Sequence, residues 1–184
     1  MNALTLPILY ILSGFFMKLS DDFYDEKNYK GIAITLGVIC GLATACASLL
    51  SYDAACIFIA ILLGNIIALK VDGIHHVVTM ATFLIIFLIG GLLTLYTGYI
   101  STTTIIVLIV CIIGAFIDEL GNDNETIYSL GKPFEIFFEY RCTMKVVILI
   151  LALCGGLSLW SFVYFICFEL AYEFARIIFK KFFL

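Results

Sequence analysis

Residues 31–50 read GIAITLGVICGLATACASLL, a run of twenty residues without a charged side chain. A helix needs about 20 mainly apolar residues to cross the hydrocarbon core of a bilayer. The sequence predicts an all-α polytopic membrane protein with about seven transmembrane helices, in a single transmembrane domain over residues 1–184. The seven apolar runs cover 2–17, 31–50, 54–69, 77–97, 102–117, 143–156 and 157–178.

The composition excludes an ordinary soluble domain. Of the 184 residues, 64% are hydrophobic and only 13% are charged. A soluble domain of this length needs more polar surface to cover its apolar residues, so lipid must cover the excess. The seven cysteines are scattered, most of them in apolar runs, and predict no disulfide framework. We expect the lipid bilayer as a partner and no binding of nucleic acid. The sequence leaves an oligomer or a membrane complex open.

The basic residues indicate the orientation of the chain. Cytoplasmic loops carry an excess of Lys and Arg. With seven spans and an external N-terminus, all ten basic residues fall at or near the cytosolic side, and among the acids only Asp53 is external. The sequence therefore predicts a multi-pass protein of the cell membrane with its C-terminus in the cytosol. The ten are Lys18, Lys27, Lys30, Lys70, Lys132, Arg141, Lys145, Arg176, Lys180 and Lys181.

An internal repeat is visible in the spacing of three glycines. Gly14, Gly64 and Gly114 each open a similar run at the cytosolic end of an odd-numbered span. This pattern is typical of one helical hairpin used three times, and such repeats often form a site where the copies meet. We expect similar hairpins over 2–50, 54–97 and 102–156, followed by a terminal helix.

The first candidate site is the acidic run Asp21-Asp22-Phe-Tyr-Asp25. On a helical turn these three carboxylates can face one way, where they repel unless a cation neutralises them. Clusters of oxygen ligands suit Mg²⁺, which takes one or two carboxylates together with phosphate oxygens. The alternative is a solvated helix end whose charge is balanced by Lys18 and its basic neighbours.

The second candidate site is the run Asp72-Gly73-Ile-His75-His76. Gly73 permits a tight turn. His75 and His76 can serve as acid–base groups or metal ligands. Adjacent residues on a helix do not face the same way, so the histidines are not expected to chelate as a pair. The alternative is a set of interfacial polar residues at a helix start.

The third candidate site follows the fifth apolar run. Asp118 and Asp123 flank a turn. We expect one of them to bind the same cation as the other four acidic residues, Asp21, Asp22, Asp25 and Asp72. The polar segment 124–142 is the best candidate for a lid or an interfacial helix. The basic side chains predicted to bind phosphate are Lys18, Lys70, Lys132 and Arg141.

One carboxylate lies well inside an apolar run. Glu169 belongs to the last hydrophobic segment, and an intramembrane carboxylate is costly unless it is functional or paired. Pairing of Glu173 with Arg176 explains the second acid of this segment. Glu169 therefore remains a candidate intramembrane residue.

The acidic run is a DDxxD motif on a predicted cytosolic loop. It resembles the aspartate-rich motifs of the UbiA-type intramembrane prenyltransferases. It also looks like the DDxxD of the polyprenyl-phosphate sugar-1-phosphate transferases, whose later Asn and Asp-Gly are similar in order to Asn65 and Asp72-Gly73. The resemblance implies Mg²⁺ bridging carboxylates to the phosphate of an isoprenoid lipid. It implies that Asp21, Asp22 and Asp25 hold the metal and that Asp72 is a further catalytic carboxylate. Asp118 and Asp123 would stand for the second acidic motif of the prenyltransferases. The resemblance covers roughly 20 residues and leaves Asp118 and Asp123 at a spacing unlike the second prenyltransferase motif.

Three functions remain open at this point. The leading hypothesis is a Mg²⁺-dependent transferase acting on an isoprenoid or lipid phosphate at the cytosolic interface. The second is a cation transporter or channel, in which Glu169 lies on the pathway. The third is a non-catalytic subunit of a membrane complex, favoured by small residues at four-residue spacing, Gly37, Gly41 and Ala45.

Overall fold

The computed structural model describes residues 4–93, 102–122 and 124–184, which form α-helices and no strand. The predicted all-α fold is therefore confirmed for this part of the chain. Seven of the helices, α1 to α5, α8 and α9, coincide with the seven apolar runs. The helices are α1 Thr5–Asp25, α2 Lys30–Leu50, α3 Tyr52–Ile67, α4 Ile74–Leu93, α5 Thr102–Gly121, α6 Glu125–Tyr128, α7 Lys132–Glu139, α8 Cys142–Leu153 and α9 Leu159–Phe183.

Three of these helices are long and apolar enough to cross a membrane by length and composition. They are α2 and the greater parts of α4 and α5, Lys30–Leu50, Ile74–Leu92 and Thr103–Gly121. The apolar helices α3 and α8 are shorter, with 16 and 12 residues. The seven-span count and the sides of the two termini stay predictions.

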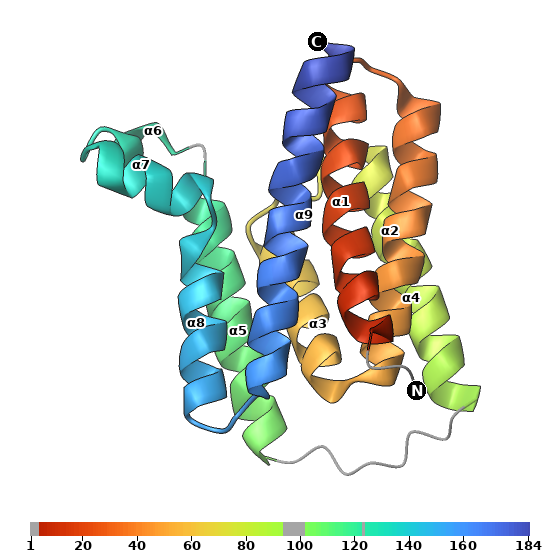
Figure 1. The fold of residues 1–184 in the computed structure, drawn as a ribbon, viewed down its shortest axis with the longest axis vertical. Coiled ribbons are helices and arrows are strands. Elements are labelled where there is room, and N and C mark those ends of the chain that lie inside the picture. The colour runs from red at the N-terminus through yellow and green to blue at the C-terminus, as the bar shows by residue number, and fades with distance from the viewer. Residues whose placement is uncertain (1–3, 94–101, 123) are drawn as a thin grey trace. The chain divides into compact units, whose positions relative to one another are not determined.

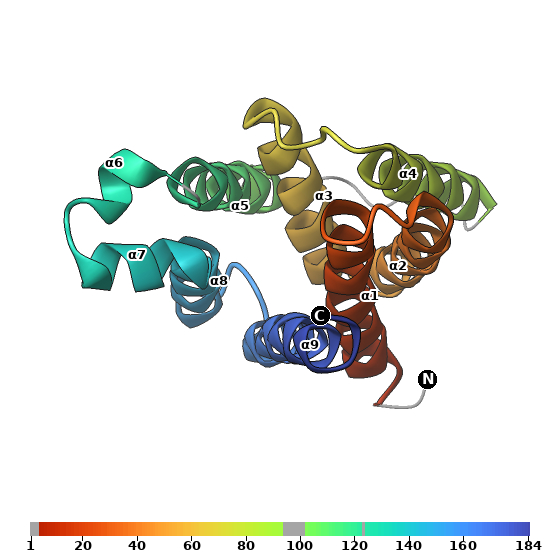
Figure 2. The same cartoon turned by 90° about the horizontal axis from the view of Figure 1, so that it is seen from above.

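The chain divides into two compact units. Unit 1 contains residues 1–55, 72–98 and 163–184, and unit 2 contains 56–71 and 99–162. Within unit 1, α1 packs against α2, and α2 packs against α4. Seen from above, α1 lies between α9 and α2 (Figure 2). Unit 1 is therefore a bundle built from segments that are far apart in the sequence.

Glycine allows the helices of unit 1 to approach closely. A Cβ atom on Gly41 would lie 2.7 Å from the backbone oxygen of Thr79, and one on Gly14 would lie 2.9 Å from the carbonyl carbon of Phe168. Gly37 likewise faces Thr79. The small-residue stripe predicted on the second span therefore lies against α4 of the same chain.

One end of unit 1 gathers the end of α1, the starts of α2 and α4, and the end of α9 (Figure 1). There Phe23, Ala33 and Phe179 form a buried hydrophobic cluster. The rings of Phe23 and Phe179 meet edge to face, with centroids 5.0 Å apart. This apolar contact fixes the last turn of α1, which carries the acidic run.

Unit 2 is built around α5. A Cβ atom on Gly64 of α3 would lie 2.6 Å from the Cβ of Ala115, and one on Gly114 would lie 3.0 Å from Val147 of α8. The helices α5 and α8 run side by side, and α7 crosses their end (Figure 1). The three glycines of the predicted repeat thus all mark close helix contacts. Whether the hairpins superpose stays a prediction.

The last apolar stretch is two helices. Gly155 has a φ of +78°, a conformation that L side chains rarely adopt, and it separates α8 from α9. The predicted division between the runs 143–156 and 157–178 therefore falls in the gap between α8 and α9. The amphipathic helix expected in the segment 124–142 is also present as α7, with exposed Phe134 and Phe137.

Candidate functional site

The acidic run lies on a helix and not on a loop. Helix α1 continues to Asp25, which corrects the sequence-based expectation. The apolar contacts of Phe23 with α9 hold this end of the helix in the bundle. The three aspartates therefore have fixed and different directions.

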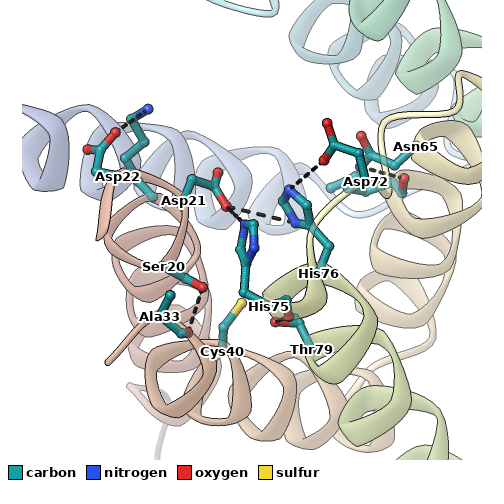
Figure 3. Close-up of polar contacts among 12 residues, drawn as sticks. Ser20, Asp21, Asp22, Ala33, Cys40, Asn65, Asp72, His75, His76 and Thr79 are labelled. Atoms are coloured by element: carbon teal, nitrogen blue, oxygen red, sulfur yellow. Dashed lines mark hydrogen bonds and ion pairs between the residues drawn. The ribbon is translucent and has the colours of Figure 1, made fainter. Parts of the chain in front are cut away.

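Asp21 faces the start of α4 (Figure 3). Its Oδ1 lies 3.3 Å from Nε2 of His75 and 3.8 Å from Nδ1 of His76. One ligand atom from each of these residues can be chosen so that all three lie within 4.8 Å of one another. We call Asp21, His75 and His76 the Asp–His–His cluster. Among the described residues it is the group of at least three acidic, cysteine or histidine side chains close enough to share a metal ion.

The polar atoms at the centre of this cluster are buried without hydrogen bonds. The side chain of His75 is 2% exposed, and neither of its ring nitrogens has a hydrogen-bond partner among the described residues. The same holds for Oδ1 of Asp21, which approaches His75 outside hydrogen-bond geometry. Leaving a buried polar group unsatisfied costs about 1–3 kcal/mol. The cluster therefore contains buried polar atoms whose hydrogen-bonding capacity is unused among the described residues.

The adjacent histidines converge, contrary to the sequence-based expectation. The centroids of their rings are 3.9 Å apart, and both rings reach Oδ1 of Asp21. They occupy the first turn of α4, which begins at Ile74. Both side chains can approach the same atom, because Asp21 belongs to another helix and its Oδ1 lies between the two imidazole rings.

Asp72 is the second carboxylate beside the histidines. Its Oδ1 lies 3.9 Å from Nε2 of His76, and its side chain is 80% exposed. His76 therefore has one nitrogen directed to each aspartate (Figure 3). Asp72 lies where the cluster meets water.

Two residues lie against His75: Tyr24, which was not predicted as part of the site, and Gly73, which was predicted only as a turn residue. The ring of Tyr24 stacks on the imidazole with centroids 4.2 Å apart. A Cβ atom on Gly73 would collide with the imidazole of His75, so Gly73 is required here for space. The backbone bends at Gly73, just before α4, without a positive φ, so it is space and not a left-handed backbone that favours glycine here. A glycine two residues before a histidine was the available clue.

Asp22 turns away from the cluster. It forms an ion pair with Lys18 at 2.8 Å, one helical turn earlier. The expectation that all three carboxylates of the acidic run face one way is therefore wrong. The same contact engages Lys18, which was predicted to bind phosphate.

Asp25 is an exposed residue at the end of α1. Partial burial of its carboxyl group raises its pKa, and the negative charges of Asp21 and Asp72 raise it further. The two histidines act in the opposite direction. The charges of the Asp–His–His cluster and of Asp72 therefore act on the pKa of Asp25, although Asp25 does not belong to the cluster.

The third predicted acidic site belongs to unit 2. Asp118 accepts hydrogen bonds from the backbone N–H groups of Thr143, at 2.9 Å, and Met144, at 2.7 Å. Both of its carboxylate oxygens therefore hold the first turn of α8. Its neighbour Glu119 pairs with Arg141 at 3.2 Å. Asp123 lies outside the described residues.

The remaining predicted residues are dispersed. Lys70 follows α3, and Lys132 begins α7, so both belong to unit 2. Glu169 is buried in α9. The pairing of Glu173 with Arg176 is confirmed, with Oε2 and Nη1 3.4 Å apart.

Comparison of the chain with protein-family models, with curated proteins and with solved structures finds no match. The resemblance to isoprenoid-phosphate enzymes therefore depends on the acidic motif and on Asn65 and Asp72-Gly73. The chemistry of the Asp–His–His cluster has to be argued from its own atoms.

Proposed function

We propose that the protein is an integral membrane enzyme that uses a divalent cation to act on the phosphate of an isoprenoid or another lipid. The observation that carries this proposal is the convergence of Asp21, His75 and His76 at one end of unit 1. Two chain segments far apart in the sequence bring a carboxylate and two imidazoles to a partly buried point, with His75 the buried member. These are groups that bind divalent cations.

The position of the cluster suits a lipid phosphate. It lies at the ends of apolar helices, and Asp72 beside it is open to water. A lipid with its tail along such helices has its phosphate near their ends. A bound cation would neutralise phosphate oxygens and polarise the phosphorus–oxygen bond, which is how metal ions assist transfer to or from phosphate.

Of the four basic side chains predicted to bind phosphate, only Lys18 belongs to unit 1. Lys18 is paired with Asp22. A cation held by the cluster would therefore supply positive charge at the phosphate that Lys18 does not. Lys70, Lys132 and Arg141 remain proposed phosphate-binding groups of unit 2, and Arg141 already pairs with Glu119.

The proposal includes the predicted setting of the protein. The chain would span the cell membrane about seven times, with its N-terminus outside and its C-terminus in the cytosol. The Asp–His–His cluster would then face the cytosol, where Mg²⁺ and phosphorylated lipid precursors are available. Cysteine-accessibility labelling at Lys180 and Asp53 tests this orientation, and labelling of both from one side would contradict it.

The decisive experiment is a reconstitution. The full chain is placed in phosphatidylcholine vesicles that contain a long-chain isoprenyl diphosphate, with water as the acceptor. Release of inorganic phosphate, from attack of water on phosphorus, or of diphosphate, from attack of water on the isoprenyl carbon, is measured with and without added Mg²⁺, Mn²⁺ or Zn²⁺. We expect metal-dependent release that EDTA abolishes and that Asp21→Asn lowers at least about tenfold, a loss of about 1.4 kcal/mol. Glu26→Gln, an exposed neighbour on the same helix end, is the matched control.

Absence of release and of metal-dependent binding of the isoprenyl diphosphate would contradict the enzyme. Equal activity of Asp21→Asn and the wild type would mean that the Asp–His–His cluster is not the site of the activity.

A cation transporter is the second candidate. It is favoured by Glu169, a carboxylate buried in the apolar helix α9. Against it, interior hydroxyl groups of unit 1 bond to backbone carbonyls. Ser13 donates to Leu9 and Thr44 to Cys40, which leaves them poorly placed to line a path. Metal uptake into the same vesicles, lost in Glu169→Gln, would favour transport.

A non-catalytic subunit is the third candidate. The sequence feature that suggested it was the small-residue stripe of α2. Gly37 and Gly41 of this stripe lie against Thr79 of α4, so packing within the chain accounts for them.

A further inference from the structure

We infer that the Asp–His–His cluster is a mixed nitrogen–oxygen site for a late first-row metal ion of the Zn²⁺ class, and that Asp72 orients one of its histidines. This inference rests on the proposed function, because it names the kind of cation that the site selects. The sequence alone pointed to Mg²⁺ and to carboxylate ligands.

The separations of Asp21 Oδ1 from the two histidine nitrogens fit a small ion, and all three ligand atoms lie within 4.8 Å of one another. Two atoms that bind a tetrahedral metal at about 2.1 Å lie about 3.4 Å from each other. The observed separations from Asp21 Oδ1, 3.3 Å to His75 and 3.8 Å to His76, bracket this value. Small rotations of the His76 and Asp21 side chains complete the geometry.

The site also contains polar groups that lack any other partner. Both ring nitrogens of His75 and Oδ1 of Asp21 are buried without hydrogen bonds among the described residues. Tyr24 stacks on one face of the His75 ring, and Gly73 lies close to the edge of the ring. A metal ion that accepts electron pairs from these atoms would give them a partner without a large movement of the side chains.

The ligand types decide between classes of ion. Mg²⁺ prefers oxygen ligands and keeps several waters. Imidazole suits Zn²⁺ and other late first-row ions, and affinity for such sites rises along the series toward copper. The cluster offers two imidazoles for one carboxylate, because Asp22 is turned to Lys18. Three protein ligands leave a coordination position open, as catalytic zinc sites do.

Asp72 is a positioning residue in this arrangement. A histidine that binds a metal through one nitrogen usually donates its other N–H to a carboxylate or a carbonyl, which fixes its tautomer. Nδ1 of His76 faces Asp21, and Nε2 faces Asp72 at 3.9 Å. The two atoms are beyond hydrogen-bond distance, so a rotation of the exposed Asp72 side chain would be needed to bring its carboxylate to Nε2. Asp72 would then hold the proton on Nε2 and leave Nδ1 free for the metal.

The test is metal titration of the full chain in detergent after removal of metals with EDTA. Zn²⁺ and Mg²⁺ are titrated by calorimetry, and imidazole coordination is detected with Cu²⁺ by electron spin-echo modulation. We expect Zn²⁺ to bind at least about tenfold more tightly than Mg²⁺. His76→Ala should abolish the modulation from that ring, and Asp21→Asn should weaken Zn²⁺ binding.

Two further variants separate ligands from their neighbours. Asp22→Asn carries the same substitution one residue away and should leave Zn²⁺ affinity unchanged. Asp72→Asn should lower it about 10- to 100-fold while imidazole coordination persists. Circular dichroism and gel filtration verify that each variant folds.

The outcomes distinguish this inference from the proposed function. Equal or tighter binding of Mg²⁺, or unchanged Zn²⁺ binding in a His75→Gln, His76→Ala double variant, would overturn the inference and leave a Mg²⁺ enzyme possible. Conversely, tight histidine-dependent Zn²⁺ binding without metal-dependent action on the isoprenyl diphosphate would support the site and contradict the enzyme. No binding of any of the three ions would overturn the site altogether.

Discussion

Oδ1 of Asp21 lies 3.3 Å from Nε2 of His75, and neither atom has a hydrogen-bond partner among the described residues. The two residues belong to α1 and α4, and both helices pack against α2. The pair is therefore held together by the bundle and not by a local turn. Any substitution that shifts one side chain, with the bundle intact, should act on metal binding more than on folding.

Gly73→Ala is expected to weaken metal binding with little loss of stability. The new Cβ would collide with the imidazole of His75. Because the ring is the end of a side chain, it can swing away, and the backbone need not move. We expect Zn²⁺ affinity to fall about 10- to 100-fold, the range seen when the orientation of a ligand is lost. Calorimetry and the melting temperature in detergent measure the two effects.

The matched control is Gly31→Ala, at the start of α2, where a Cβ atom would meet nothing within 4 Å. It should preserve Zn²⁺ affinity. A Gly73→Ala protein that binds Zn²⁺ like the wild type would mean that the position of His75 is irrelevant to the site.

Gly14→Ala is expected to destabilise unit 1 directly. A Cβ atom there would overlap the backbone carbonyl of Phe168, and a backbone group cannot rotate aside. Helices α1 and α9 would have to separate. Overpacking of a buried contact costs about 1–3 kcal/mol, so the melting temperature should fall clearly.

Gly91→Ala serves as the control for this substitution, since a Cβ atom on Gly91 meets nothing within 4 Å. A fall of equal size in both variants would show that the loss comes from the helices themselves and not from the contact between α1 and α9.

Asp118→Ala is expected to loosen the start of α8. Arg141 stands at the N-cap position of this helix, where its side chain makes no capping hydrogen bond. Asp118 supplies the missing acceptors to Thr143 and Met144 from a neighbouring helix. Loss of a helix cap costs about 1–2 kcal/mol. Hydrogen exchange at the amides of Thr143 and Met144 should accelerate in the variant.

Asp118→Asn keeps one oxygen acceptor and should lose less stability than Asp118→Ala. If metal binding fell in both variants while exchange at α8 stayed slow, Asp118 would instead belong to the cation site, as the sequence suggested.

The sequence predicted the helices better than the directions of their side chains. Hydrophobic runs located seven of the helices and the break at Gly155, because apolar length and glycine act locally. The acidic run was expected to present its three carboxylates together. The helix instead directs Asp22 to Lys18 and Asp21 to another helix, and the packing of α1, α2 and α4 determines this.

The convergence of the two histidines was not predictable for the same reason. Adjacent residues on a helix point in different directions, so their spacing along α4 argues against a contact with one shared atom. They share such a contact only because Asp21 lies between them. Asp21 has that position because Gly37 and Gly41 let α2 approach α4 closely while α1 packs on α2. Such a relationship depends on two helix contacts at once, and no single segment of the sequence contains it.

Asp25→Asn is expected to stabilise the metal-free protein in a pH-dependent way. The folded state raises the pKa of Asp25 above its ordinary value of 3.8, through partial burial and the charges of Asp21 and Asp72. In the range just above 3.8 the folded protein therefore binds a proton that the unfolded chain has lost, and stability falls as the pH rises through it. Above that range the ionised carboxylate carries its full cost, and Asn removes it. The variant should have the melting temperature of the wild type at low pH and a higher one at neutral pH. The gain in the free energy of unfolding should be less than about 1 kcal/mol, because the residue is exposed.

Glu26→Gln removes one negative charge from the next residue, outside the cluster, and should change the pH profile less. A variant that melts below the wild type at neutral pH would mean that the charge of Asp25 supports the fold, with the histidines as its partners.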